Sequence, residues 1–196
     1  MKLPDSFYQR SNVQRVAKDL LGKVLVTRVN KSLTSGIIVE TEAYSFRERG
    51  CHAYDYLRTA RTEIMFLPGG HAYVYLCYGI HQLFNVVTNK VDKPEAVLIR
   101  ALQPMIGEEM MMKRMAVEKL TRITSGPGKL TKALGIDRKL NGNSLLNDEV
   151  WIEDIGTKIV KKDIVATTRI GIDYAGEDAE LPWRYYIKGN PWISKA

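Results

Sequence analysis

Two glutamates lie in Gly36–Tyr44, a run rich in β-branched residues that is typical of a β-strand. Strict alternation puts Glu40, Glu42 and Tyr44 on one face of that strand, and Ile38 with them. A carboxylate on an otherwise apolar strand is costly to bury unless it is paired or used in chemistry. Such a carboxylate could act as a general base toward water. The alternative is an exposed strand end, at which both glutamates meet lysine or arginine.

Aromatic residues are dense in the middle of the chain. Tyr73, Tyr75 and Tyr78 lie close together, in the first of two runs that are predicted to form a hairpin, His71–Tyr78 and Gln82–Asn89. These tyrosines could be core residues with hydroxyl tips, or they could form a stacking surface for a planar ligand. Tyr78 stands at the predicted hairpin tip, where a large aromatic side chain is exposed. In a basic protein, an aromatic residue at such a tip is suited to insertion between base pairs from the minor groove.

A run of small residues precedes a predicted helix near residue 128. Ser125, Gly126 and Lys129 belong to this run, TSGPGKL at residues 124–130. Free backbone N–H groups at a helix start, together with a lysine, can hold a phosphate. The spacing is not that of a P-loop, and a simple capped helix start explains the run equally well.

Strands dominate the elements that must position these residues. Besides the runs already named, strands are predicted at Lys23–Val29, Ala96–Leu102, 150–154, 164–172 and 183–189, with a turn over 30–35. Apolar spacing predicts helices at Phe7–Leu21, Gly107–Glu118 and Gly128–Leu134, and the methionines at 110–112 and 115 are expected to pack against the core. Because strands cluster rather than alternate with helices, we expect an α+β fold. Residues 1–196 should form a single domain with a curved mixed or antiparallel β-sheet, flanking helices and a protruding β-hairpin.

The composition is that of an ordinary globular protein with a basic excess. There are 29 lysines and arginines against 22 acidic residues, a net charge of +7, which permits a polyanionic partner. The two cysteines and three histidines lack metal-ligand spacing, so we expect neither a metal site nor a disulfide framework. No apolar run approaches the roughly 20 residues that span a membrane, and the first residues do not resemble a signal peptide. We therefore expect a soluble intracellular protein without membrane association.

Seven motifs, in their order along the chain, resemble the alkyladenine (3-methyladenine) DNA glycosylase family, whose monofunctional enzymes remove alkylated purines. Together they are far more specific than any one of them. The motifs are VETEAY at 39–44, CHA at 51–53, MFLPGGHAYVYLCYGIHQLFNVV at 65–87, AVLIRALQP at 96–104, SGPGKLTKALGI at 125–136, RIGI at 169–172 and WRYYIKGNPWIS at 183–194.

The resemblance implies roles for the residues that carry it. Glu42 matches the family's general base, and Arg100 and the backbone of Ile170 match the groups that position the attacking water. A base inside a duplex cannot be reached, so the damaged nucleotide must be flipped out. Tyr78 matches the side chain that intercalates where that base has left.

A further set of residues matches the pocket for the flipped base. Tyr44 and His52 are expected on one side of the base and Tyr75 on the other, and Asn85 matches the residue that discriminates against normal purines, chiefly guanine. Phosphate contacts are expected from Met65, Ser125, Gly126 and Lys129.

Two segments depart from the family pattern. Residues 45–50, SFRERG, are short and highly charged and lack the acidic residues that the family leads us to expect there. Arg61-Thr62 stands where an Arg-Asn pair is usual. These departures affect loop structure and DNA contacts rather than the catalytic set.

The resemblance implies a monofunctional DNA glycosylase that excises 3-methyladenine and 7-methylguanine, with hypoxanthine as a further candidate, by Glu-activated water and without strand cleavage. It implies no cofactor, a double-stranded DNA partner that contains a damaged base, and a monomer, in the cytoplasm of a prokaryote or in the nucleus of a eukaryote. Two other classes stay open. One is a non-catalytic nucleic-acid-binding protein that uses aromatic stacking; the other is a metal nuclease built on Glu40 and Glu42.

Overall fold

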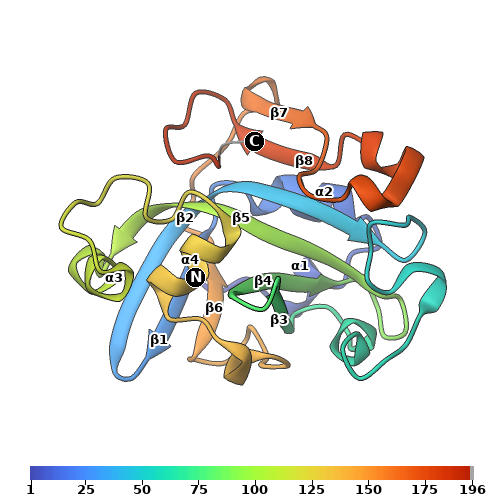
Figure 1. Ribbon diagram of the computed structural model, residues 1–196, viewed down its shortest axis with the longest axis horizontal. Helices are drawn as coiled ribbons and strands as arrows, with labels where there is room; N and C mark the ends of the chain where they lie inside the picture. Colours follow the sequence, from blue (N-terminus) through green and yellow to red (C-terminus); the bar gives the residue numbers. More distant parts are fainter. Residues whose placement is uncertain (195–196) are drawn as a thin grey trace.

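A single antiparallel sheet organises the protein, whose computed structural model describes residues 1–194 (Figure 1). Within these residues six strands follow the order β3-β4-β5-β2-β1-β6, and β8 pairs with β2 and with β7. Two long curved strands, β2 and β5, cross the middle of the molecule in Figure 1. The strands are β1 (Val24–Val29), β2 (Ser32–Ser45), β3 (Ala72–Cys77), β4 (His81–Thr88), β5 (Glu95–Ile106), β6 (Val150–Glu153), β7 (Ile164–Thr167) and β8 (Arg184–Ile187).

Short helices and 3₁₀ turns surround the sheet, and the predicted α+β fold with its protruding hairpin is confirmed. The α-helices are α1 (Asp5–Tyr8), α2 (Val13–Leu20), α3 (Glu108–Met115) and α4 (Pro127–Leu134), and the 3₁₀ turns are Tyr54–Tyr56, Glu63–Phe66, Arg138–Leu140, Lys161–Asp163 and Asp173–Glu180. None of the helices described between residues 1 and 194 is long and apolar enough to cross a membrane.

The helix predicted over Phe7–Leu21 is two helices. The side chain of Asn12 accepts a hydrogen bond from the Arg15 amide and starts α2. Asparagine is among the preferred N-cap residues, since its side chain satisfies an amide that the helix leaves without a partner. The apolar spacing continues across the break because α2 still buries Val13, Val16, Ala17 and Leu20.

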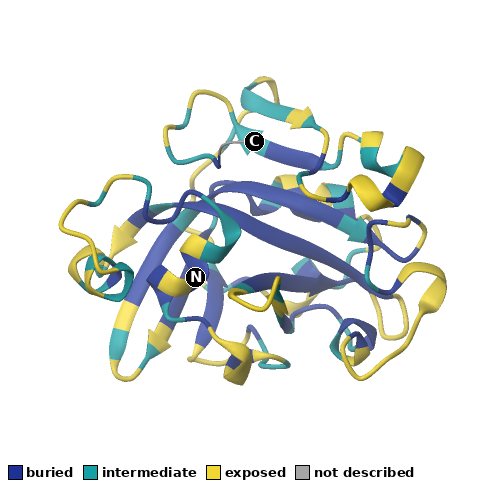
Figure 2. Ribbon diagram, viewed as in Figure 1, coloured by how far each residue is buried: buried dark blue, intermediate teal, exposed yellow. Residues whose placement is uncertain are grey.

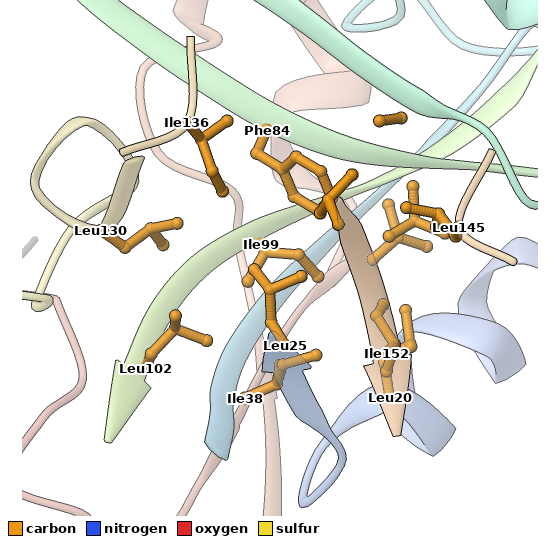
Figure 3. Close-up of a cluster of buried hydrophobic side chains, with 14 of the residues drawn as sticks. Leu20, Leu25, Ile38, Phe84, Ile99, Leu102, Leu130, Ile136, Leu145 and Ile152 are labelled. Carbon is orange, nitrogen blue, oxygen red and sulfur yellow. The ribbon is translucent and has the colours of Figure 1, made fainter. Parts of the chain in front are cut away.

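The main core is formed by α2 and α4 together with strands β1, β2, β4 and β5. Figure 3 shows Leu25, Ile38 and Ile99 from neighbouring strands packed together with Phe84 and Leu130. Figure 2 shows the same pattern across the molecule: the strand centres are buried, whereas the loops are exposed. Met111 is fully buried in this core, and Met112 and Met115 pack against it, as predicted for the methionine run. Burial of this kind contributes roughly 25 cal/mol per Å² of apolar surface, so it holds β2 and β5 firmly in place.

An irregularity between β2 and β5 corrects the strict alternation predicted for residues 36–44. Ile38 pairs with Leu102 and Glu40 with Ala101, so Val39 is an extra residue in β2. An extra residue reverses the alternation of faces. Ile38 consequently lies in the main core rather than on the face of the glutamates. The next register shift leaves Arg100 as an extra residue in β5, beside Glu40.

Three predicted boundaries also change. The turn predicted over 30–35 shortens to Asn30 and Lys31, both with positive φ, and β2 begins at Ser32. The β5 strand continues to Ile106 because it pairs with the longer β2. The strand predicted over 164–172 ends at Thr167, where its pairing with β8 ends.

Candidate active site

Glu42 is fully buried on β2 and is held by Tyr44 of the same strand and by two groups from distant parts of the chain. Its Oε1 accepts a hydrogen bond from the backbone amide of Ile170 at 2.8 Å. Its Oε2 accepts one from the Tyr44 hydroxyl at 2.8 Å and lies 3.3 Å from Nη1 of Arg100. A carboxylate has about four acceptor positions. Three are occupied, and the fourth, on Oε1 beside the Ile170 amide, has no partner among the described residues.

Arg100 links Glu42 to the second glutamate. Its Nε lies 3.1 Å from Oε1 of Glu40, and Arg184 lies 3.2 Å from the same oxygen. The Ser194 amide and hydroxyl also donate to Glu40, at 2.6 and 2.8 Å. Burial by itself would lower the pKa of Arg100, but Glu42 and Glu40 together raise it. The glutamates therefore lie in a buried charge network and not at the exposed strand end considered above.

An ion pair that the sequence did not reveal fixes Ile170. Arg169 forms two hydrogen bonds to Glu48, at 2.8 and 2.7 Å, and one to the Ala43 carbonyl at 3.0 Å. Its guanidinium also lies over the Tyr44 ring, 4.8 Å from the centroid. Glu48 belongs to SFRERG, so this segment does supply an acidic residue, contrary to the prediction. The pair anchors the backbone that presents the Ile170 amide to Glu42.

A cavity of about 610 Å³, within the size range of ligand pockets, is lined by the three partners of Glu42, namely Tyr44, Arg100 and Ile170. Its lining brings together Tyr44, His52, Tyr75, Asn85 and Arg100 together with the backbone region of Ile170. Tyr44 and Tyr75 both pack against a small buried cluster around Phe66. Burial and the neighbouring Glu42 raise the pKa of Tyr44, so its hydroxyl keeps its proton and donates it to Glu42 in a hydrogen bond.

His52 and Tyr75 lie on the same wall of this cavity. Their ring centroids are 4.6 Å apart with planes at 78°, an edge-to-face contact that leaves no room for a base between them. The prediction that His52 and Tyr75 flank the base from opposite sides is therefore wrong. Nδ1 of His52 lies 2.9 Å from the Tyr73 hydroxyl. Burial and, secondarily, Arg61 lower the pKa of His52 to about 4, so the ring is neutral at pH 7.

Asn85 lies at the floor of the cavity on β4. Asn85 is buried, and its side-chain amide nitrogen donates a hydrogen bond to the Tyr73 carbonyl at 3.1 Å. The cross-strand neighbours of Asn85 are Tyr73 and Leu98. A fixed polar side chain in a mostly aromatic pocket is suited to reading the polar edge of a ligand.

The β3–β4 hairpin and the start of α4 border the same cavity. Tyr78 is 85% exposed at the hairpin tip, and Ile80, two residues further on, is 74% exposed. The tip end of the hairpin touches α4 so closely that a Cβ on Gly128 would lie 2.9 Å from the His81 ring. The predicted tip and the predicted helix start are thus neighbours in space (Figure 1).

The α4 start has the form of an anion site. Gly126 is its N-cap, with φ at 136°, and Lys129 is exposed. The Ser125 hydroxyl is buried at this turn without a hydrogen-bond partner among the described residues. Pro127 has no amide hydrogen and the Gly126 amide donates to the Thr124 carbonyl at 3.2 Å, so Gly128 and Lys129 carry the first-turn amides that lack helical partners. These groups are available to an anionic ligand.

Comparison with known proteins identifies the family of the chain. The model of the family described as methylpurine-DNA glycosylase matches residues 6–191. The chain belongs to the methylpurine-DNA glycosylase family. It is 48% identical over 195 residues to a protein of Carboxydothermus hydrogenoformans, with 100% of both chains covered. It is 46% identical to one of Natranaerobius thermophilus, with 99% of each covered, and 48% identical to one of Methanocella arvoryzae, with 98% of this chain and 96% of the other covered. All three relatives are provisionally named 3-methyladenine DNA glycosylase.

Within this methylpurine-DNA glycosylase fold, one predicted phosphate contact lacks support. Met65 is buried in the cluster around Phe66, and its amide already donates to the Thr62 carbonyl at 2.8 Å. Neither group is free to meet a phosphate, whereas Ser125, Gly126 and Lys129 stay predictions.

The metal-nuclease alternative also loses its basis in this family member. Such an enzyme needs carboxylate oxygens that are free to coordinate an ion. Glu40 and Glu42 instead share Arg100, and residues 1–194 contain no group of three His, Cys, Asp or Glu side chains placed to hold a metal.

Proposed function

We propose that the protein is a monofunctional DNA glycosylase that hydrolyses the N-glycosidic bond of alkylated purines in double-stranded DNA. Its substrates are 3-methyladenine and 7-methylguanine, with hypoxanthine as a further base. It acts as a monomer without a cofactor, and in a prokaryotic cell it works in the cytoplasm, where the DNA lies. The observation that carries this proposal is a buried Glu42 whose three partners, Tyr44, Arg100 and Ile170, all line an aromatic cavity.

Base capture depends on the hairpin and the aromatic walls. Tyr78 fills the gap left by the flipped nucleotide, which slows the return of the base. Tyr44 faces the flipped purine on one side, and His52 with Tyr75 on the other. Stacking contributes roughly 1–3 kcal/mol per base. A purine methylated at N3 or N7 is positively charged in DNA, so the electron-rich rings attract it by about 0.5–2 kcal/mol more.

Hydrolysis uses the open position on Glu42. A water molecule there donates a hydrogen bond to Oε1 and attacks C1′ of the sugar as the bond to the purine breaks. The electron pair of that bond leaves with the purine, which neutralises the methylated base. Glu42 takes the proton of the water and offsets the positive charge that develops on the sugar. Arg100 places a positive charge 3.3 Å from Oε2 of Glu42, and the Ile170 amide fixes the orientation of the carboxylate.

No lysine nucleophile is required for this route, so the abasic product keeps an intact strand. A lyase would need an amine that attacks C1′ and forms a Schiff base. At the cavity, Lys129 lies at the α4 start, on the side of the proposed phosphate contacts.

The test is base release from a duplex that carries one lesion at a stated salt concentration. Glu42→Gln keeps the shape and an acceptor for the Ile170 amide but cannot take a proton. We expect at least a hundredfold slower release with DNA binding retained, since general acid–base catalysis contributes about 10²–10⁴-fold. Undiminished release by Glu42→Gln would remove Glu42 from the mechanism. Lesion binding by the wild type with no release of any base would instead support the non-catalytic alternative.

A further inference from the structure

Arg61 lies on the aromatic wall of the cavity, next to Thr62, which stands where the family pattern has an asparagine. Its Nη2 is 3.2 Å from Nε2 of His52, and its guanidinium carbon lies 4.9 Å from the centroid of the Tyr75 ring. Its residue is exposed, and the loop around it joins the 3₁₀ turns Tyr54–Tyr56 and Glu63–Phe66. The side chain therefore reaches from an exposed loop back over the pocket.

Arg61 differs from Arg58, in the same loop, in the kind of group that its guanidinium contacts. The Arg58 guanidinium pairs with Glu63 and Asp92 at 2.6 and 3.2 Å. Among the described residues no carboxylate lies within ion-pair distance of Arg61. Its contacts are with uncharged groups, the imidazole of His52 and the face of Tyr75. A contact between a cation and an aromatic ring contributes only about 0.5–2 kcal/mol, so a ligand that binds the same ring can displace Arg61.

Arg61 covers the face of the Tyr75 ring on which a flipped purine would stack. The guanidinium is a flat cation on an electron-rich ring, and a methylated purine in DNA is also a flat cation that such a ring attracts. The two cannot occupy the same face of Tyr75. A guanidinium that stays nearby also repels a charged base more than a neutral one.

We propose that Arg61 is a gate and a specificity-determining residue of the base pocket, which covers Tyr75 in the free protein and disfavours cationic bases relative to neutral ones. This inference rests on the proposed function. It assigns a role to a residue outside the set that stacks on the base or activates water.

The hydrogen bond from Arg61 also determines which ring nitrogen of His52 carries the hydrogen. Arginine only donates, so Nε2 of His52 accepts and Nδ1 carries the hydrogen, which it donates to the Tyr73 hydroxyl. When Arg61 moves aside, Nε2 becomes a free acceptor that faces the pocket. Displacement of the gate therefore exposes both the ring of Tyr75 and an acceptor for an N–H group of the base.

The experiment compares excision of 7-methylguanine, a cationic lesion, with excision of hypoxanthine, a neutral one, in duplexes of the same sequence. Arg61→Ala should raise kcat/KM for both lesions and raise the ratio of 7-methylguanine to hypoxanthine at least fivefold. Arg61→Lys keeps the charge and should keep the ratio within twofold of the wild type. The ratio cancels the loss of general DNA attraction, and Arg58→Ala, which removes a charge from the same loop, measures that loss directly.

A second readout does not depend on turnover. In ¹⁵N spectra of the free protein, with His52 assigned from His52→Gln, the wild type should show the hydrogen on Nδ1, and Arg61→Ala should shift the population toward the other tautomer. An unchanged His52 spectrum, or a lesion ratio within twofold of the wild type in Arg61→Ala, overturns the inference and leaves the proposed function intact. A wild type that releases neither lesion refutes the proposed function and this inference with it.

Discussion

Removal of Arg169 should destabilise the fold and displace the Ile170 amide. Arg169 is 5% exposed and Glu48 1% exposed, and two hydrogen bonds of 2.7 and 2.8 Å join them. Arg169→Met leaves a buried carboxylate without its cation, a change that costs about 3–5 kcal/mol. The amides of Ser45 and Gly50 still donate to Glu48, at 3.2 and 2.8 Å. We therefore expect a loss near the lower limit, about 3 kcal/mol.

Urea unfolding gives this loss directly, and a thermal scan gives it as a fall in Tm. At about 2–4 °C per kcal/mol for a domain of this size, Tm should fall by roughly 6–12 °C. The matched control is the double variant Glu48→Met with Arg169→Met, which removes both charges and should be more stable than Arg169→Met alone. A loss below about 1 kcal/mol in Arg169→Met, or a double variant less stable than the single one, would refute the reasoning.

Two further predictions concern the hairpin tip and the imidazole. Because Tyr78 is exposed, Tyr78→Ser should leave the free energy of unfolding within about 0.5 kcal/mol of the wild type. The same variant should lower kcat/KM on a lesion duplex by on the order of tenfold. An equal effect of Ile80→Ser would show that the tip needs only a bulky side chain and not an aromatic ring. The pKa of His52 is lowered to about 4 in the folded protein, so the unfolded chain binds more protons below its own pKa of about 6.5. Stability should therefore be fully present above pH 6.5 and fall toward pH 4, by up to about 1.4 kcal/mol per pH unit, and this extra slope should be absent from urea titrations of His52→Gln.

The strands could be predicted because their local pattern and their burial agree. The β1, β3 and β4 strands, the hairpin tip and the α4 start all follow from local signals. These signals are the alternation of side chains along a strand and the turn residues at its ends. The extra residue at Val39 could not be predicted in this way, because it depends on how β2 pairs with β5. The break before α2 did have a local signal, the capping residue Asn12, but the apolar spacing on both sides concealed it.

The candidate site divides in a similar way. The resemblance indicated Glu42, Arg100 and Ile170, and the structure brings all three together. The ion pair of Glu48 and Arg169 could not be foreseen, since 121 positions separate its members and each alone looks like an ordinary surface charge. The position of Arg61 over Tyr75 depends on the path of an irregular loop, which has no periodic pattern to predict it.

The long sequence separations around the glutamates have a consequence for the newly made protein. The groups that hold Glu42 and Glu40 include Ile170, 128 positions after the first, and Ser194, 154 positions after the second. Synthesis proceeds from the N-terminus at about 5–20 residues per second. A chain still on the ribosome, with β1 to β5 already made, has its two carboxylates but lacks the amides that orient them. Under the proposed function, a nascent chain therefore gains the ability to remove bases only after Ile170 and Ser194 have been added.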